Sequence, residues 1–125
     1  MWIRAALVGL FGLLVWSAPA SGAITLRYAV VLGNNVAPST ELPPLAHAER
    51  EARRLTRALT KRARFDPSRV RLVTGGGSVG LRRAVAELRQ QRDRDRATYG
   101  NIRTVFAFFY TGHGLQGQLA LADGP

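Results

Sequence analysis

VFAFFYTGHG, residues 105–114, contains the strongest structural signal in this sequence. Its first six residues are apolar and rich in aromatic rings, which is typical of a strand buried on both faces. A turn follows at once, with His113 between two glycines. Gly112 and Gly114 would allow unusual backbone angles, so the Gly114 N–H could approach a substrate oxygen that His113 also faces. The segment therefore predicts half of an acyl-transfer site, but the sequence contains no cysteine to act as the nucleophile.

Strands and helices are expected to alternate along the chain. Apolar segments predict strands at about residues 25–32, 70–74 and 103–110. This order predicts an α/β fold with a doubly wound, mostly parallel sheet. In such sheets ligands bind at the carboxyl ends of the strands, where the strand order reverses, and His113 follows such an end. Three strands and two helices cover a parallel sheet thinly, so we expect the sheet to be incomplete in this chain.

Two helices are predicted between these strands. The first should begin at Pro43-Pro44, end near Arg64 and bury one apolar face, made of Leu45, Ala48, Ala52, Leu55 and Leu59. Ser78 is expected to cap the second, whose apolar stripe of Leu81, Val85 and Leu88 gives way to charged residues after Gln90.

The first 23 residues resemble a signal peptide. Arg4 supplies a positive start, and the following apolar run to Trp16 ends before small residues that fit a cleavage site. The run is shorter than the roughly 20 apolar residues of a spanning helix, so a cleaved leader is favoured over an uncleaved anchor. We therefore expect residues 24–125 to be exported, to the periplasm or the outside, with no stable membrane anchor after the leader is removed.

Basic residues give the chain a formal net charge of +10. Segments such as residues 50–54 and 92–96 interleave acids with arginines, which is typical of solvated helix faces and not of a groove that follows phosphates. No aromatic residues alternate with these charges to stack on bases. We expect no nucleic-acid partner.

YTGHG, residues 110–114, resembles the Tyr-Ser-Gly-His-Gly motif of caspase-like cysteine peptidases, the family of caspases, metacaspases and their bacterial relatives. YAVVLGNN, residues 28–35, is similar to the family's first strand, and LAHAEREA, residues 45–52, is similar to its first helix. Thr111 and Glu51 stand where the family usually has Ser and Asp.

This resemblance extends from about Leu26 to Asp123 and implies the N-terminal part of a caspase-like domain. In the family, a cysteine thiol and the histidine of this motif form a dyad, and the next glycine N–H helps to hold the oxyanion. Carried over, these roles fall on His113 and Gly114, with the cysteine expected beyond Pro125. The resemblance implies a polypeptide substrate or partner protein and no cofactor. A non-catalytic caspase-fold interaction module is the alternative, because the sequence lacks the thiol.

The glycine-rich loop GGGSVG, residues 75–80, offers two competing interpretations. It matches both the dinucleotide fingerprint G-x-G-x-x-G and the nucleophile elbow G-x-S-x-G. The first lacks an acid at the end of the next strand to bind a ribose. The second would make Ser78 the nucleophile of a serine hydrolase with His113 as its base, although the acids between them lie on a charged helix. A plain connecting loop is the remaining interpretation.

Two other residues carry weaker signals. His47 and Glu51 are four residues apart on a predicted helix, and such a lone pair is weak evidence for a metal, so we expect no metal site. Asp123 could orient a catalytic histidine, but a turn residue is the simpler interpretation.

Overall fold

The computed structural model describes residues 22–75, 77–116, 118–121 and 123. The predicted leader, residues 1–23, therefore lies outside the described residues except for its last two positions. Among the residues that are described, no helix is both long and apolar enough to cross a membrane.

Three parallel strands form the main sheet in the order β2-β1-β3. They are β1 (Ile24–Gly33), β2 (Val70–Thr74) and β3 (Ile102–Thr111). Each predicted strand is confirmed to within one residue at either end. The central strand β1 pairs with β3 along its whole length and with β2 from Ala29 onward. Its second half, from Tyr28 to Gly33, is fully buried because both faces of the sheet are covered there.

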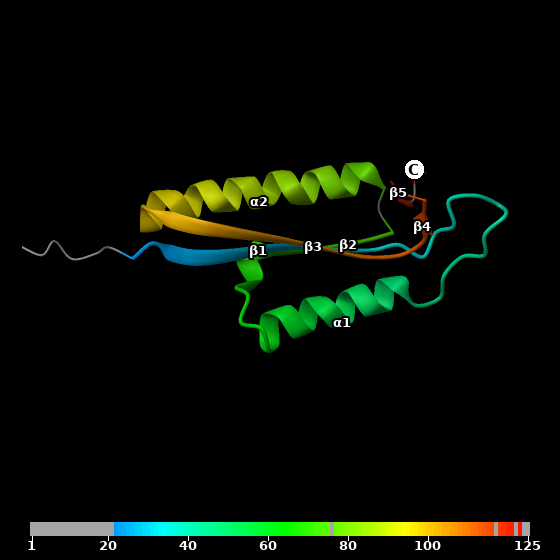
Figure 1. The fold of residues 1–125 in the computed structure, drawn as a ribbon, viewed down its shortest axis with the longest axis horizontal. Coiled ribbons are helices and arrows are strands. Elements are labelled where there is room, and N and C mark those ends of the chain that lie inside the picture. Colours follow the sequence, from blue (N-terminus) through cyan, green and yellow to red (C-terminus); the bar gives the residue numbers. More distant parts are fainter. Residues whose placement is uncertain (1–21, 76, 117, 122, 124–125) are drawn as a thin grey trace, which may run out of the picture.

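Helices α1 (Ala48–Lys61) and α2 (Ser78–Tyr99) lie on opposite faces of the sheet (Figure 1). On one face α1 packs Ala52 and Leu59 against Ala29 and Val31 of β1. The chain passes from β1 through α1 to β2, and then crosses back over β1 through α2 to β3. The doubly wound α/β fold is confirmed, and the strand order reverses between β1 and β3.

Helix α1 begins later than predicted, at Ala48 instead of Pro43-Pro44. Residues 34–47 form a loop that Asn35 closes: its carbonyl accepts the Leu45 N–H at 2.8 Å, and its side-chain Oδ1 accepts the Glu49 N–H at 3.1 Å. A distant asparagine thus satisfies an orphan donor of the first helical turn. Leu45 consequently lies outside the helix.

The prediction that Ser78 caps α2 is wrong. Gly77 is the N-cap and Ser78 is the first helical residue. The Ser78 N–H instead donates to the carboxylate of Asp123, at 2.9 Å from each oxygen. A residue 45 positions away in sequence therefore caps this helix.

The charged run at residues 92–96 is not entirely a solvated face, because Asp95 is buried. Its carboxylate accepts the Tyr28 hydroxyl at 2.7 Å, the Arg69 Nε at 2.8 Å and the Gln91 side chain at 3.1 Å. The hydrogen bonds from Arg69 hold the pKa of Asp95 at about 2. Burial, with a smaller effect of Asp95, raises the pKa of Tyr28 to about 12. This network ties the end of α2 to β1 and to the short 3₁₀ helix η1 (Pro67–Arg69).

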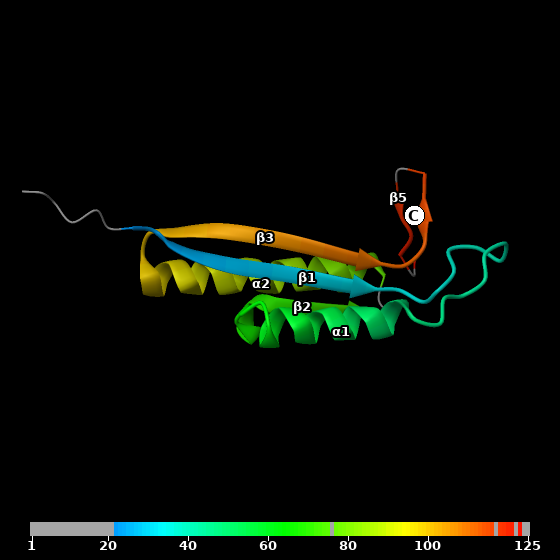
Figure 2. The ribbon, with the colours of Figure 1, turned by 60° about the horizontal axis from the view of Figure 1, so that its bottom comes forward.

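The expectation that residues 105–110 are buried on both faces is also wrong in this structure. Val105, Phe106 and Phe108 are 45%, 51% and 41% exposed. The reason is topological: β3 is an edge strand of the described sheet and pairs only with β1 (Figure 2). After β3, strands β4 (Gly114–Leu115) and β5 (Gln118–Leu119) form a small antiparallel hairpin.

Candidate functional site

The loops that follow β1 and β3 meet at the carboxyl edge of the sheet. The Asn34 N–H donates to the Thr111 carbonyl at 3.0 Å, which continues the pairing of the two strands by one residue. His113 comes two residues after β3, so it lies where the strand order reverses. This is the position at which doubly wound sheets bind their ligands.

The His113 imidazole contacts the loop after β1. Its Nε2 lies 2.9 Å from the Pro43 carbonyl oxygen. A carbonyl oxygen only accepts hydrogen bonds, so Nε2 carries a hydrogen and donates it. In the neutral ring the lone pair then lies on Nδ1, which is the atom that can take up a proton. The His113 residue is partly exposed to solvent.

Hydrogen bonds to its carbonyl group fix the backbone of His113. Its carbonyl accepts the Ala120 N–H at 3.0 Å and lies 2.7 Å from the Tyr110 hydroxyl. That hydroxyl is also 2.6 Å from the Ala120 carbonyl. A Cβ atom at Gly112 would collide with the Tyr110 hydroxyl. Glycine at position 112 is therefore required by the Tyr110 side chain that folds back over it.

The predicted unusual backbone angles at the two flanking glycines are not found. Among the described residues, positive φ values at glycine occur at Gly75 and Gly100, not at Gly112 or Gly114. Gly114 begins β4, opposite Leu119, and a Cβ atom there would meet open space. The reason for glycine differs between the two positions: at 112 it is a steric requirement, and at 114 the described residues impose none.

Asn34 is a site residue that the sequence analysis did not assign. Its side chain is fully buried, donates from Nδ2 to the Ala120 carbonyl at 3.0 Å and to the Val36 carbonyl at 3.2 Å, and accepts the Val36 N–H at 3.0 Å. The position of Asn34 directly after a buried strand could have indicated this role, because a buried amide must form hydrogen bonds.

Ser78 and Asp123 form a pair of their own. The Ser78 hydroxyl donates to Asp123 Oδ2 at 2.6 Å, and hydrogen bonds from the Ser78 side chain and backbone lower the pKa of Asp123. Ser78 thus forms its hydrogen bond with Asp123, and His113 forms its own with Pro43, so the described hydrogen bonds do not pair the two side chains. The Asp123 carboxylate also lies against Gly77, at the helix N-terminus where a dinucleotide would place its pyrophosphate.

His47 and Glu51 do not converge on a common point. His47 Nδ1 lies 2.8 Å from the Arg50 guanidinium, and Glu51 pairs with Arg54 at 3.0 Å. In the part of the chain that the structure describes, no cluster of three or more metal-ligating side chains is present.

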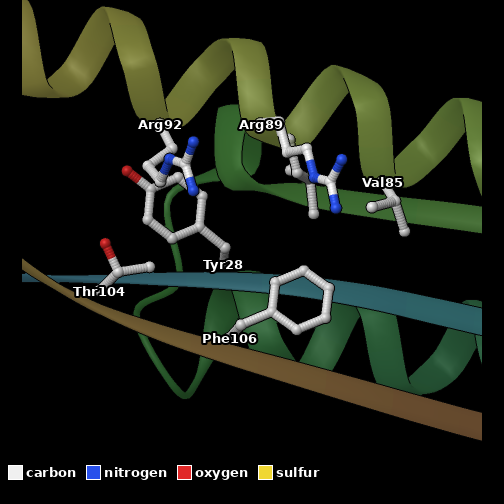
Figure 3. A pocket seen from close by; sticks show the side chains of 7 residues that line it. Tyr28, Val85, Arg89, Arg92, Thr104 and Phe106 are labelled. Carbon is white, nitrogen blue, oxygen red and sulfur yellow. The ribbon is translucent and has the colours of Figure 1, made fainter.

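An apolar pocket of about 260 Å³ opens between α2 and β3 (Figure 3), and His113 is not among its lining residues. Arg89, Arg92 and Val85 reach it from α2, and Thr104 and Phe106 reach it from β3. A second hollow of about 400 Å³ lies on the α1 face, and its lining includes Tyr110 and Thr111 at the end of β3.

Residues 26–124 match the family model of the caspase domain. The chain belongs to the caspase-domain family. This match covers β1 from Leu26 onward, β2, β3, both helices and the loop that carries His113, so the resemblance of the Tyr-Thr-Gly-His-Gly motif is confirmed at the level of the family. No curated protein and no solved structure matches this caspase domain.

Proposed function

We propose that this caspase domain supplies the histidine of a cysteine endopeptidase, with the thiol contributed from outside these 125 residues. The observation that supports the proposal most directly is the hydrogen bond from His113 Nε2 to the Pro43 carbonyl at the carboxyl edge of the sheet. It leaves Nδ1 as the proton acceptor, and it fixes the ring plane with a partner that cannot itself take the proton.

In the proposed reaction, Nδ1 of His113 accepts the thiol proton, and the thiolate attacks the scissile carbonyl carbon of a polypeptide. The Gly114 N–H donates to the oxygen that becomes negative in the tetrahedral intermediate. His113 then returns the proton from Nδ1 to the leaving amine, and the C–N bond breaks to give a thioester. Water hydrolyses the thioester with His113 again as the base. Throughout, Nε2–H stays bonded to the Pro43 carbonyl.

Polypeptide substrates and export are parts of the same proposal. The family match supports a protein as the substrate or partner. Residues 1–23 have the composition of a signal peptide, so we place the mature domain in the periplasm or outside the cell.

A non-catalytic interaction module is the second candidate, and one observation favours it: the sequence contains no cysteine. The two candidates differ in whether the natural gene product carries a thiol that reacts. Reading the genomic DNA past the Pro125 codon tests this. An in-frame cysteine on a hydrophobic strand supports the peptidase, and a stop codon directly after Pro125 supports the module.

The serine-hydrolase alternative receives no support from the geometry. Its nucleophile Ser78 donates its hydroxyl proton to Asp123, and its base His113 is bonded to Pro43. A serine is activated by an adjacent imidazole, and this pairing is absent from the described hydrogen bonds.

A further inference from the structure

Two side chains and the backbone of Ala120 form a set of hydrogen bonds around the His113 carbonyl, which we call the Tyr110–Asn34 clamp. Its members are the Tyr110 hydroxyl, the Asn34 carboxamide and the N–H and C=O groups of Ala120. The clamp joins the end of β1, the end of β3 and the residue after β5. Asn34 and Ala120 are fully buried.

Tyr110 has one hydroxyl proton and two carbonyl acceptors, on His113 at 2.7 Å and on Ala120 at 2.6 Å. Both acceptors have a second donor: the Ala120 N–H reaches the His113 carbonyl at 3.0 Å, and Asn34 Nδ2 reaches the Ala120 carbonyl at 3.0 Å. Neither carbonyl is left unsatisfied, wherever the hydroxyl proton points. A fully satisfied polar network of this kind holds its members in one arrangement.

The clamp affects the two groups that orient the imidazole, which are the backbone of His113 and the Pro43 carbonyl. Tyr110 and Ala120 hold the carbonyl of His113 itself. Asn34 begins the loop that brings Pro43 to Nε2, and its own N–H is bonded to Thr111, two residues before His113. Loss of these hydrogen bonds would therefore change the position of the Pro43 carbonyl relative to the His113 backbone.

From this arrangement we infer that Tyr110 and Asn34 are positioning residues that hold His113 in the tautomer with hydrogen on Nε2, while neither of them touches the substrate. Burial raises the pKa of Tyr110, which keeps its hydroxyl a neutral donor. The inference on the tautomer stands on geometry, and its consequence for catalysis rests on the proposed function.

The same arrangement explains the spacing of the Tyr-Thr-Gly-His segment. Because Tyr110 folds back toward the carbonyl of His113, its hydroxyl occupies the space of a Cβ atom at Gly112. Gly112→Ala should consequently displace the hydroxyl and have the same effect as Tyr110→Phe. Gly114→Ala is the matched control for the NMR measurement only, since a Cβ atom there meets open space, whereas the Gly114 N–H belongs to the proposed catalytic site.

The test is nitrogen NMR on the natural full-length protein with ¹⁵N-labelled histidine, in which His113→Gln assigns the relevant signals. In the wild type, neutral His113 should show hydrogen on Nε2. Tyr110→Phe and Asn34→Ala should move both ring-nitrogen shifts toward those of free histidine, with a several-fold fall in the tautomer ratio. Tyr28→Phe also removes a buried hydroxyl, but from the Asp95 network, and it should leave these shifts unchanged.

Unchanged His113 shifts in a folded Tyr110→Phe protein would overturn the inference, as would equal changes in Tyr110→Phe and Tyr28→Phe. If Tyr110→Phe does not fold, Gly112→Ala measured against Gly114→Ala decides in the same way. In a peptidase assay, Tyr110→Phe should lower kcat on the order of 10-fold with little change in KM. A wild-type protein without peptidase activity would end the proposed function, while the NMR result would still decide the role of the clamp.

Discussion

His113 and Pro43 lie 70 residues apart in sequence and are joined by a hydrogen bond of 2.9 Å from the imidazole Nε2 to the backbone carbonyl. The loop after β1 and the loop after β3 are thereby linked at the edge of the sheet where ligands bind. The bond assigns the hydrogen of the neutral ring to Nε2, so Nδ1 is the ring nitrogen that carries the lone pair.

Asp95→Asn should destabilise the domain by about 3 kcal/mol, because Arg69 would lose its buried carboxylate partner and keep only the exposed Asp66. The free energy of unfolding, from urea titration at pH 7, measures this. Asp93→Asn is the control, since Asp93 lies two residues away on the same helix with an exposed side chain and should change stability by no more than about 0.5 kcal/mol. Equal effects of the two substitutions would contradict the burial of Asp95.

The contribution of Asp95 should also depend on pH. Its pKa falls from the ordinary value of 3.8 to about 2 in the folded protein, so the folded state favours the charged form. The resulting stabilisation, about 2 kcal/mol, is present above pH 3.8 and is lost as the pH falls toward 2. The difference in unfolding free energy between the wild type and Asp95→Asn should therefore shrink between pH 5 and pH 2. A difference that stays constant over this range would show that Asp95 does not titrate as the network requires.

Residues 24–125, produced alone, should self-associate or melt without a sharp transition. The edge strand β3 exposes Val105, Phe106 and Phe108, and unpaired edges with apolar side chains pair with other chains. Size-exclusion chromatography and thermal melting measure this, and Phe106→Lys should reduce the association. A monomer that melts cooperatively would contradict the prediction.

Export should leave a shortened N-terminus. Small residues precede Ser21 and Ile24, so N-terminal sequencing of the exported protein should begin at one of these two positions. If only uncleaved protein is recovered, and only from membranes, the leader is an anchor and the prediction fails.

The sheet and the position of His113 could be predicted from the sequence because their signals are local. Apolar runs mark the three strands, and alternation with helices fixes the parallel topology. The buried role of Asp95 could not be predicted in the same way, since five alternating charges form the pattern of a solvated helix. Its partners, Tyr28 and Arg69, come from β1 and η1 and meet it only when the chain is folded.

The start of α2 and the support of His113 were missed for the same reason. Ser78 matches a helix cap in sequence, yet the cap comes from Asp123, 45 residues later. Asn34 is one of two adjacent asparagines after a strand, and only the folded chain shows that it reaches Ala120, 86 residues away. Long-range hydrogen bonds leave no periodic pattern in a sequence, whereas strands and helices do.

The central claim is that His113 is the general base and acid of a cysteine peptidase. The most direct test is peptidase activity of the natural full-length protein with three substitutions: His113→Ala, His47→Ala and Ser78→Ala. His113→Ala should lower activity by a factor on the order of 100 or more, as expected when a general acid and base is lost. His47→Ala and Ser78→Ala should each change activity little, and alkylation of cysteine should abolish it. If Ser78→Ala abolishes hydrolysis while alkylation does not, the nucleophile is a serine and the account of His113 as the partner of a thiol is wrong.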